Sequence, residues 1–371
     1  MPEAKRQFMR RALELAARGL GSVEPNPMVG AVIVRDGQEI AAGWHRRFGG
    51  PHAEREALAA AREAGRDVHG ATMYVTLEPC CHHGKTPPCT EAILQAGIAR
   101  VVVAMTDPDE RVAGRGLALL VEAGLAVEVG VCEAEARELL AAYVKLRTLA
   151  RPWVVCKWAQ TADGFLALPA GQGRWVSGEA SRLRVHELRG ICDGLCAGSG
   201  TVLADDPLLT NRSGRGRHPA RVVLDGRLRT PPDSQVIVTA RAELPVLVAT
   251  TARAIAGEPA RAESLRRAGV ELLDLPAGPG GRGVDLPALL DELGRRRWTR
   301  VLIEGGAAVL RSVLEAGLAD ELWVFVSPRR AGPNAEGLPR LDIAEFRERL
   351  VLSGVAEERL GPDVLLRFRR A

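Results

Sequence analysis

Four residues in the first half of the chain have the types and the spacing of a metal-assisted hydrolytic site. His52 and Glu54 stand two apart at the start of a predicted helix, and Cys80 and Cys89 follow in the next loop. One histidine and two cysteines supply three zinc ligands and leave the fourth tetrahedral position to water. Zinc lowers the pKa of such a water to about 7. The set therefore predicts a zinc-activated water with Glu54 beside it as the proton shuttle.

The spacing departs from the zinc-deaminase pattern H-x-E…P-C-x-x-C in one place. Eight residues separate Cys80 from Cys89, where the pattern has two. Two alternatives stay open: a closed structural zinc site with His82 or His83 as the fourth ligand, and a segment without any metal. A structural site has no need of Glu54, which favours the hydrolytic interpretation.

The elements predicted around these residues alternate between strand and helix. Strands are expected at 29–34, 39–44, 72–77 and 101–104, and helices at 52–64, 89–96, 116–123 and 133–147. Several of the strands are continuous apolar runs, which is typical of strands covered on both faces. The pattern predicts an α/β layer fold.

The second half of the chain alternates in the same way after Leu149-Ala150-Arg151-Pro152, so we predict the domain boundary between residues 148 and 149. Strands are expected at 153–157, 190–197, 221–225, 236–239, 300–303 and 321–326, and helices at 261–268, 286–297 and 307–316. No G-x-G-x-x-G directly follows one of these predicted strands, but Gly305-Gly306 lie between a predicted strand and a helix. Glycines there let phosphates approach backbone amides, although a tight structural turn explains them equally.

Length, composition and charge limit the classes of protein to which the chain can belong. The 371 residues are 46% hydrophobic and 26% charged, and 50 basic against 46 acidic residues give a net charge of +4. These values are ordinary for a globular protein of two domains and give no case for a nucleic-acid-coating surface. The chain contains no run of about 18 apolar residues, so a membrane span is not expected.

The seven cysteines are odd in number and unevenly spaced. No secretory signal is visible, so we expect a reducing, cytoplasmic location and no disulfides. Four cysteines lie in or next to apolar strands and are predicted to be buried by packing: Cys132, Cys156, Cys192 and Cys196.

The loop from Cys80 to Cys89 resembles that of the bifunctional deaminase–reductases of riboflavin biosynthesis. Further matches follow in order along the chain: Pro25-Asn26-Pro27-Met28-Val29-Gly30, Gly43-Trp44-His45, Pro51-His52-Ala53-Glu54 and Thr76-Leu77-Glu78-Pro79-Cys80. The resemblance covers essentially the whole chain. It implies a cytidine-deaminase-like three-layer domain at 1–148 and a dihydrofolate-reductase-like domain at 149–371.

For the first domain the resemblance implies removal of the 2-amino group of 2,5-diamino-6-(5-phosphoribosylamino)pyrimidin-4(3H)-one as ammonia. Zinc hydroxide on His52, Cys80 and Cys89 would attack ring C2, while Glu54 moves the proton to N3 and then to the departing amine. The implied substrate contacts are Asn26, His45, His82, Lys85 and Asp107. Three of these have a simpler explanation: Asn26 as a turn cap, His45 as a solvated strand end, and Asp107-Pro108 as an ordinary turn.

For the second domain the resemblance implies NADPH-dependent reduction at C1′ of the ribosylamine, which opens the sugar to a ribityl chain. The matching motifs are Lys157 through Asp163-Gly164, Gly173-Arg174-Trp175, residues 198–207 and Glu304-Gly305-Gly306. The implied NADPH contacts are Ala159, Trp175, Thr201, Asp205 and Gly306, and the implied substrate contacts are Arg189, Leu209, Arg212 and Glu304. Gly173 stands where the family often has serine, so a side-chain hydrogen bond is missing there.

Two other functions stay open on the sequence alone. A nucleobase deaminase acting on tRNA or DNA would use the second half to bind nucleic acid, but the balanced charge and the lack of a basic, aromatic stripe argue against it. A binding protein with a structural zinc would not turn a substrate over. We therefore expect a phosphorylated aminopyrimidine substrate, no nucleic-acid or membrane partner, and a homo-oligomer.

Overall fold

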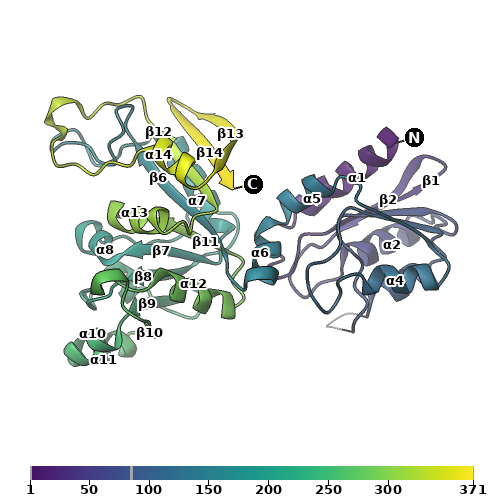
Figure 1. The fold of residues 1–371 in the computed structure, drawn as a ribbon, viewed down its shortest axis with the longest axis horizontal. Coiled ribbons are helices and arrows are strands. Elements are labelled where there is room, and N and C mark those ends of the chain that lie inside the picture. Colours follow the sequence, from purple (N-terminus) through teal and green to yellow (C-terminus); the bar gives the residue numbers. More distant parts are fainter. Residues whose placement is uncertain (1, 84–86, 371) are drawn as a thin grey trace. The chain divides into compact units, whose positions relative to one another are not determined.

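The computed structural model describes residues 2–83 and 87–370, and the chain divides into two compact units, Met1–Ala150 and Arg151–Ala371 (Figure 1). Helix α6 (Ala141–Leu149) ends at Ala150, which takes a left-handed backbone conformation. Pro152 follows at once and cannot continue a helix. The local sequence therefore stops the first unit before the first strand of the second unit begins.

The first unit is built on a five-stranded sheet in the order β2-β1-β3-β4-β5. Its strands are β1 (Gly30–Arg35), β2 (Gln38–Trp44), β3 (Thr72–Val75), β4 (Arg100–Val103) and β5 (Ala126–Val129). Strand β1 pairs antiparallel with β2 and β3, whereas β3, β4 and β5 run parallel. Strands β1, β3 and β4 are buried except at one end residue each, which is expected of strands covered on both faces.

Helices cover both faces of this sheet and make the unit a three-layer sandwich, as predicted. Helices α1 (Pro2–Ala17), α5 (Glu133–Leu139) and α6 pack on one face. Helices α2 (Ala53–Glu63), α3 (Cys89–Gln95) and α4 (Arg115–Glu122) pack on the other. The single helix predicted at 133–147 is wrong, because the chain bends at Leu140 and forms α5 and α6.

The second unit contains a nine-stranded sheet in the order β10-β9-β8-β7-β11-β6-β12-β14-β13. Its strands are β6 (Trp153–Gln160), β7 (Gly194–Gly198), β8 (Ala220–Leu224), β9 (Val246–Thr250), β10 (Glu271–Asp274), β11 (Arg300–Glu304), β12 (Glu321–Val326), β13 (Leu352–Leu360) and β14 (Asp363–Arg370). The strands from β10 to β12 run parallel, and the C-terminal hairpin of β13 and β14 is antiparallel.

The helices of the second unit are α7 (Glu179–Gly190), α8 (Ser199–Asp205), α9 (Gln235–Val238), α10 (Ala252–Gly257), α11 (Pro259–Arg267), α12 (Leu286–Arg295), α13 (Ala307–Glu315) and α14 (Ile343–Arg349), with short 3₁₀ turns η1 (Pro279–Gly281) and η2 (Gly332–Ala335). Side chains of α12, α13 and α14 pack on one face of the sheet and form its largest apolar cluster. Strand β11 lies between β6 and β7. The carboxyl ends of β7 and β11 are therefore neighbours, which is where open α/β sheets bind ligands.

Two further sequence expectations are wrong. The strand expected at 236–239 lies largely in the short helix α9, because a run of three apolar residues does not distinguish a buried strand from a helix. Cys156, Cys192 and Cys196 are buried as predicted, but Cys132 is only partly buried. It precedes α5 in a left-handed conformation at the edge of the apolar cluster.

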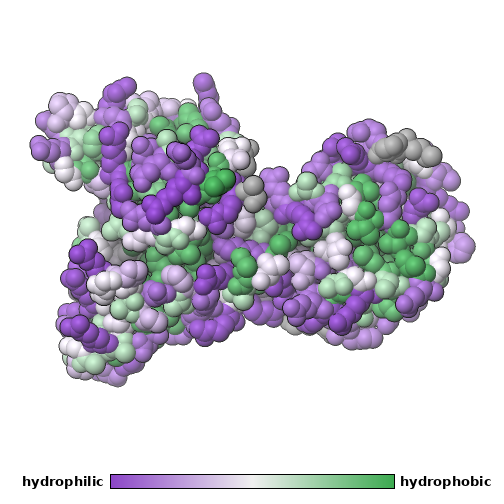
Figure 2. Space-filling view, viewed as in Figure 1, coloured by the Kyte–Doolittle hydropathy of each residue, from purple (hydrophilic) through white to green (hydrophobic). Residues whose placement is uncertain are grey.

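Within the described residues, no helix has both the length and the apolar character needed to cross a membrane. The face in Figure 2 mixes hydrophilic with hydrophobic residues over both units.

Candidate active sites

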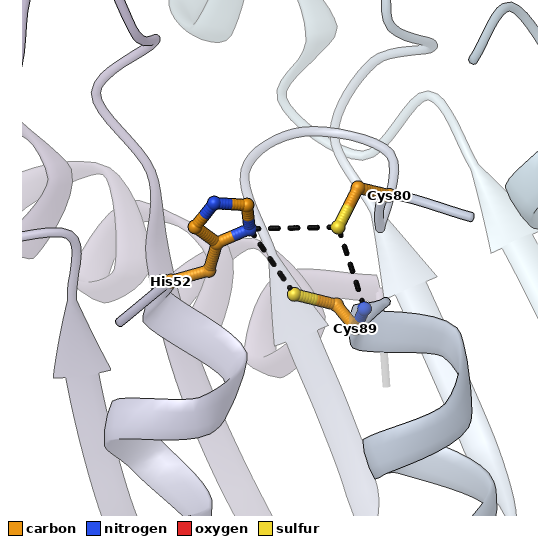
Figure 3. A group of neighbouring side chains, drawn as sticks. All are labelled: His52, Cys80 and Cys89. Carbon is orange, nitrogen blue, oxygen red and sulfur yellow. Dashed lines mark hydrogen bonds between the residues drawn. The ribbon is translucent and has the colours of Figure 1, made fainter. Parts of the chain in front are cut away.

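The zinc-ligand candidates converge in the first unit. His52 immediately precedes α2, Cys89 is the first residue of α3, and Cys80 lies on the loop after β3 (Figure 3). The Nδ1 atom of His52 lies 3.5 Å from the Cys80 sulfur and 3.3 Å from the Cys89 sulfur. The first amide of α3 donates a hydrogen bond of 3.3 Å to the Cys80 sulfur. The Cys89 thiol and His52 also donate to this sulfur, which lowers the pKa of Cys80.

This donor set fits zinc. Bonds of about 2.0–2.3 Å at tetrahedral angles place neighbouring nitrogen and sulfur ligands about 3.5 Å apart, which is the separation found here. Among the described residues, these three side chains form the one group able to hold a metal. His83 instead lies 3.8 Å from Glu91, and the buried Nδ1 of His82 has no partner. The described residues therefore offer no fourth protein ligand, and the closed structural site loses its support.

Glu54 lies in the first turn of α2 beside this group, with 3% of its surface exposed. Burial raises the pKa of its carboxyl group, and the negative charge of Cys80 raises it further. A raised pKa favours the protonated form of the carboxyl group over the ionised form, which suits a group that takes up a proton. The position two residues after His52 brings an acid–base group and a metal ligand to the same helix start.

Glu78 fixes the loop that carries Cys80, and the sequence interpretation did not single it out. Its buried carboxylate accepts backbone hydrogen bonds of 2.9 Å from Gly114 and from Gly116 and one of 3.2 Å from Asp107. A Cβ atom at Gly116 would meet the Pro79 carbonyl at 2.1 Å, so only glycine permits this approach. The one available signal was an acidic residue between an apolar strand and a predicted ligand.

A short hydrogen-bonded chain runs from Asn26 through His45 to Pro51, the residue before His52. Asn26 Nδ2 lies 3.3 Å from His45 Nε2, and His45 Nδ1 lies 2.8 Å from the Pro51 carbonyl oxygen. Because that carbonyl can only accept, Nδ1 carries the proton and Nε2 accepts from the amide. The His45 ring meets the His52 ring edge-on at 5.4 Å between centroids. His45 is only 2% exposed, and burial lowers its pKa, so it is not a solvated strand end.

The other predicted deaminase contacts are placed differently. Asp107 accepts hydrogen bonds of 2.9 Å from the Asp109 amide and from the Tyr143 hydroxyl, so it does form a turn. Burial raises its pKa to about 6. His82 is partly buried and lies within the loop from Cys80 to Cys89. Lys85 lies outside the described residues.

In the second unit, two glycine-rich turns meet at the carboxyl ends of β7 and β11. Gly305 and Gly306 both take left-handed conformations between β11 and α13. A Cβ atom on either glycine would lie 3.1 Å from the nearest atom of Thr201, which belongs to α8 after β7. Because glycine has no side chain, phosphates of a dinucleotide can approach the backbone amides at these adjacent strand ends and accept hydrogen bonds from them. Ala159 lies on β6 beside Phe325 of β12.

The end of β11 also carries a buried charged group. The Glu304 carboxylate pairs with the Arg189 guanidinium and accepts a longer contact of 3.5 Å from Lys157. Glu304 is 5% exposed, and Lys157 and Arg189 are partly buried. Burial lowers the pKa of Lys157, while the two cations keep the pKa of Glu304 below its usual value.

A loop at 208–217 borders this group and contains Leu209 and Arg212. Leu209 is buried in a left-handed conformation, and Arg212 is exposed. The fully buried guanidinium of Arg221 donates to the Leu208 carbonyl and to Thr239, and so holds the start of the loop. This role of Arg221 could not be predicted from the sequence, because an arginine at the start of an apolar strand is usually a surface residue.

Trp175 is 53% exposed and stands between two guanidinium groups, with Arg174 at 5.2 Å and Arg182 at 5.3 Å from its ring centroid. Arg329 donates to the backbone carbonyls of Gln172 and Trp175. Between them, Gly173 has a φ of +97°, which disfavours serine. The side chain of Arg329 thus holds this turn by its hydrogen bonds to backbone carbonyls. Arg174 also donates to the Asp205 carbonyl at 3.2 Å.

Comparisons with known protein families agree with this division. Residues 2–105 match the cytidine and deoxycytidylate deaminase zinc-binding region, and residues 152–366 match the RibD C-terminal domain.

Whole-chain relatives are also found. The riboflavin biosynthesis protein RibD of Aquifex aeolicus is 40% identical over 99% of both chains, and that of Actinobacillus pleuropneumoniae is 38% identical over 97% of this chain and 94% of its own. The solved structure of Acinetobacter baumannii RibD superposes with a TM-score of 0.85 at 36% identity over the full length of both chains. A Thermotoga maritima diaminohydroxyphosphoribosylaminopyrimidine deaminase/5-amino-6-(5-phosphoribosylamino)uracil reductase gives 0.84 at 36% identity, over 100% of this chain and 99% of its own.

Proposed function

Because the chain belongs to the RibD family, the bifunctional deaminase–reductases of riboflavin biosynthesis, we propose that the side chains gathered in each unit carry out one of the two reactions. The protein is a zinc-dependent deaminase and an NADPH-dependent reductase. We assign deamination to residues 1–148 and reduction to residues 149–371. The observation that carries the proposal is the buried Glu54 beside His52, Cys80 and Cys89.

In the deaminase site, His52, Cys80 and Cys89 would hold zinc. The metal would activate a water molecule by lowering its pKa to about 7. Glu54 takes one proton from the attacking water and delivers it to ring N3. It then takes the proton of the resulting C2 hydroxyl and delivers it to the 2-amino group. The bond from C2 to oxygen forms, the bond from C2 to nitrogen breaks, and ammonia leaves. The burial of Glu54 beside the three metal donors supports this role, and its raised pKa favours uptake of the proton.

Asn26, His45, His82, Lys85 and Asp107 are assigned to the aminopyrimidine substrate. Support is strongest for Asn26 and His45. The two are hydrogen-bonded to each other, and His45 contacts the ring of His52. Neutral His45 offers no charge that would repel a cationic leaving amine.

In the reductase site, Ala159, Trp175, Thr201, Asp205 and Gly306 are assigned to NADPH, which when bound supplies the hydride that C1′ of the ribosylamine accepts. Arg189, Leu209, Arg212 and Glu304 are assigned to the substrate. The bare turns at Gly305 and Gly306 support the cofactor assignment. The buried Glu304 can orient the substrate, because Arg189 and Lys157 hold its carboxylate in place.

NADPH is expected to be preferred over NADH. The one G-x-G-x-x-G match, at residues 278–283, lies in a proline- and glycine-rich loop and not directly between a strand and a helix, so it is not the dinucleotide-binding turn whose acidic partner binds a ribose 2′-hydroxyl. The second half is also rich in arginine, which can bind a 2′-phosphate. A charge-assisted contact to the 2′-phosphate stabilises binding by about 1.5–3 kcal/mol, so kcat/KM should differ by about tenfold or more. Initial rates with each cofactor measure this, and equal kcat/KM values would refute it.

A chain divided between Ala150 and Arg151 is expected to yield two folded pieces. Each unit has its own sheet and its own apolar core, which independent folding requires. The N-terminal piece should hold about one zinc ion per chain. The C-terminal piece should oxidise NADPH when given the deaminated substrate. Insoluble aggregates from both pieces, with the intact chain folded under the same conditions, would mean that neither unit folds alone.

We further propose a cytoplasmic location and assembly into a homo-oligomer. The free state of all seven cysteines supports a reducing compartment. The homo-oligomer stays a prediction that sedimentation of the purified chain can test.

A further inference from the structure

His186 lies on α7 and faces the loop that carries Arg212. Its ring Nδ1 accepts the backbone N–H of Arg212 at 3.2 Å. One turn further along the helix, Arg189 Nη1 donates to the Thr210 carbonyl at 2.8 Å. Two side chains of one helix therefore hold residues 210–212. His186 accepts a hydrogen bond from this segment, and Arg189 donates one to it.

The hydrogen bond from Arg212 defines the state of the imidazole. An atom that accepts an amide N–H carries no proton, so the ring is neutral with its proton on Nε2. Burial and the neighbouring cations Arg189 and Arg212 together lower the pKa of His186 to about 4, against smaller opposing effects of Glu304 and of the Thr210 backbone. At neutral pH the acceptor is thus permanently available.

The guanidinium of Arg212 is exposed, and within the described part of the chain it forms no hydrogen bond or ion pair. Arg189 differs, because Glu304 already neutralises its charge. The guanidinium of Arg212 therefore lies at the edge of the site without an anionic partner, and His186 holds the backbone that carries it. Such a fork matches the oxygens of a phosphate monoester.

We propose that His186 is a positioning residue of the reductase site, which holds the backbone of Arg212 so that its guanidinium meets the 5′-phosphate of the ribosylamine substrate. The inference rests on the proposed reductase function and adds a residue to it. The shared chemistry is a phosphate monoester, which the substrate carries at its 5′ position and NADPH at its 2′ position. Glu304, which is assigned to the substrate, pairs with Arg189, and Arg189 also holds this loop. This arrangement favours the phosphate of the substrate over that of NADPH.

The test compares His186→Leu with His186→Asn in the full chain. Leucine removes the acceptor, whereas the asparagine amide oxygen takes the place of Nδ1. We measure KM and kcat for the deaminated substrate, for the same compound without its phosphate, and for NADPH. His186→Leu should raise KM for the phosphorylated substrate about tenfold to a hundredfold, the range of one charge-assisted hydrogen bond, with a smaller change in kcat. KM for the unphosphorylated compound and for NADPH should not change, and His186→Asn should stay within a few-fold of the parent.

Arg212→Gln should reproduce the rise in KM for the phosphorylated substrate, and its exposed side chain poses no risk to folding. The double variant should be hardly worse than either single one, because both act through one contact. His218→Leu is the control and should leave every constant unchanged, because His218 is exposed and lies just after residue 217, at the far end of this loop.

Three results would overturn the inference. One is a KM for the phosphorylated substrate that His186→Leu leaves unaltered. Another is an equal loss in His186→Asn, which would mean that the acceptor is irrelevant. The third is a rise in KM for NADPH but not for the substrate, which would assign the phosphate contact to the cofactor. A parent protein that does not reduce the substrate at all would instead refute the proposed function.

Discussion

Replacing Glu54 by glutamine is expected to abolish deamination while the zinc site and the fold survive. An amide has nearly the same shape as the carboxyl group but cannot take up and release a proton. General acid–base assistance of this kind contributes about 10²–10⁴-fold to the rate, so kcat should fall by that factor. Glu54 is not one of the three grouped metal donors, and zinc per chain should therefore stay at the parental level. Ammonia release and elemental analysis measure the two quantities.

The matched control is Glu63→Gln, since Glu63 is exposed near the other end of the same helix. It should deaminate at the parental rate. The reductase reaction, supplied with deaminated substrate, should be unaffected in both variants, because Glu54 belongs to the other unit. Deamination by Glu54→Gln within a few-fold of the parent would remove Glu54 from the mechanism.

Cys80→Ser is expected to lose most of the bound zinc and most of the deaminase activity, whereas Cys81→Ser should keep both. The Cys80 sulfur lies 3.5 Å from His52 Nδ1, and a hydroxyl is a poor substitute for a thiolate on zinc. The neighbouring Cys81 sulfur points elsewhere, since it lies 4.0 Å from the carbonyl oxygen of Arg111. Burial raises the pKa of the Cys81 thiol, which further disfavours it as a ligand.

The decisive comparison is zinc per chain for the two single variants, prepared side by side. Each serves as the control for the other, because both replace a thiol by a hydroxyl at adjacent positions in the same loop. An empty site in Cys81→Ser would show that the assigned ligands are wrong by one residue. Retention of zinc in Cys80→Ser would show that Cys81 can replace it.

The metal donors could be predicted from sequence, but what holds them in place could not. His52, Cys80 and Cys89 reveal themselves by residue type and spacing. The carboxylate of Glu78, by contrast, accepts hydrogen bonds from backbone amides between residues 107 and 117. Such partners cannot be recognised from a sequence, because every residue type except proline has a backbone amide N–H. The same limit applies to Arg221, whose partners in the loop include the Leu208 carbonyl.

The strand and helix alternation was sufficient to predict the layered α/β class, because long apolar runs and amphipathic helices are strong signals. Short segments were not. Val236 to Val238 belong to a helix, and Leu140 separates two helices where one was expected, since packing decides such segments. The sequence showed Gly173 as a missing side-chain contact. Only the backbone angle explains it, because a left-handed residue held by Arg329 favours glycine.

The most direct test of the whole account is one incubation of the intact chain with zinc and the diamino substrate, divided into samples with and without NADPH and analysed by mass spectrometry. Without NADPH, the account predicts a single product in which the 2-amino group is replaced by oxygen and one ammonia is released per substrate. With NADPH, that product should gain two hydrogens as NADPH is consumed. An unchanged substrate mass in both samples, or a reduced product in the sample without NADPH, would contradict the account.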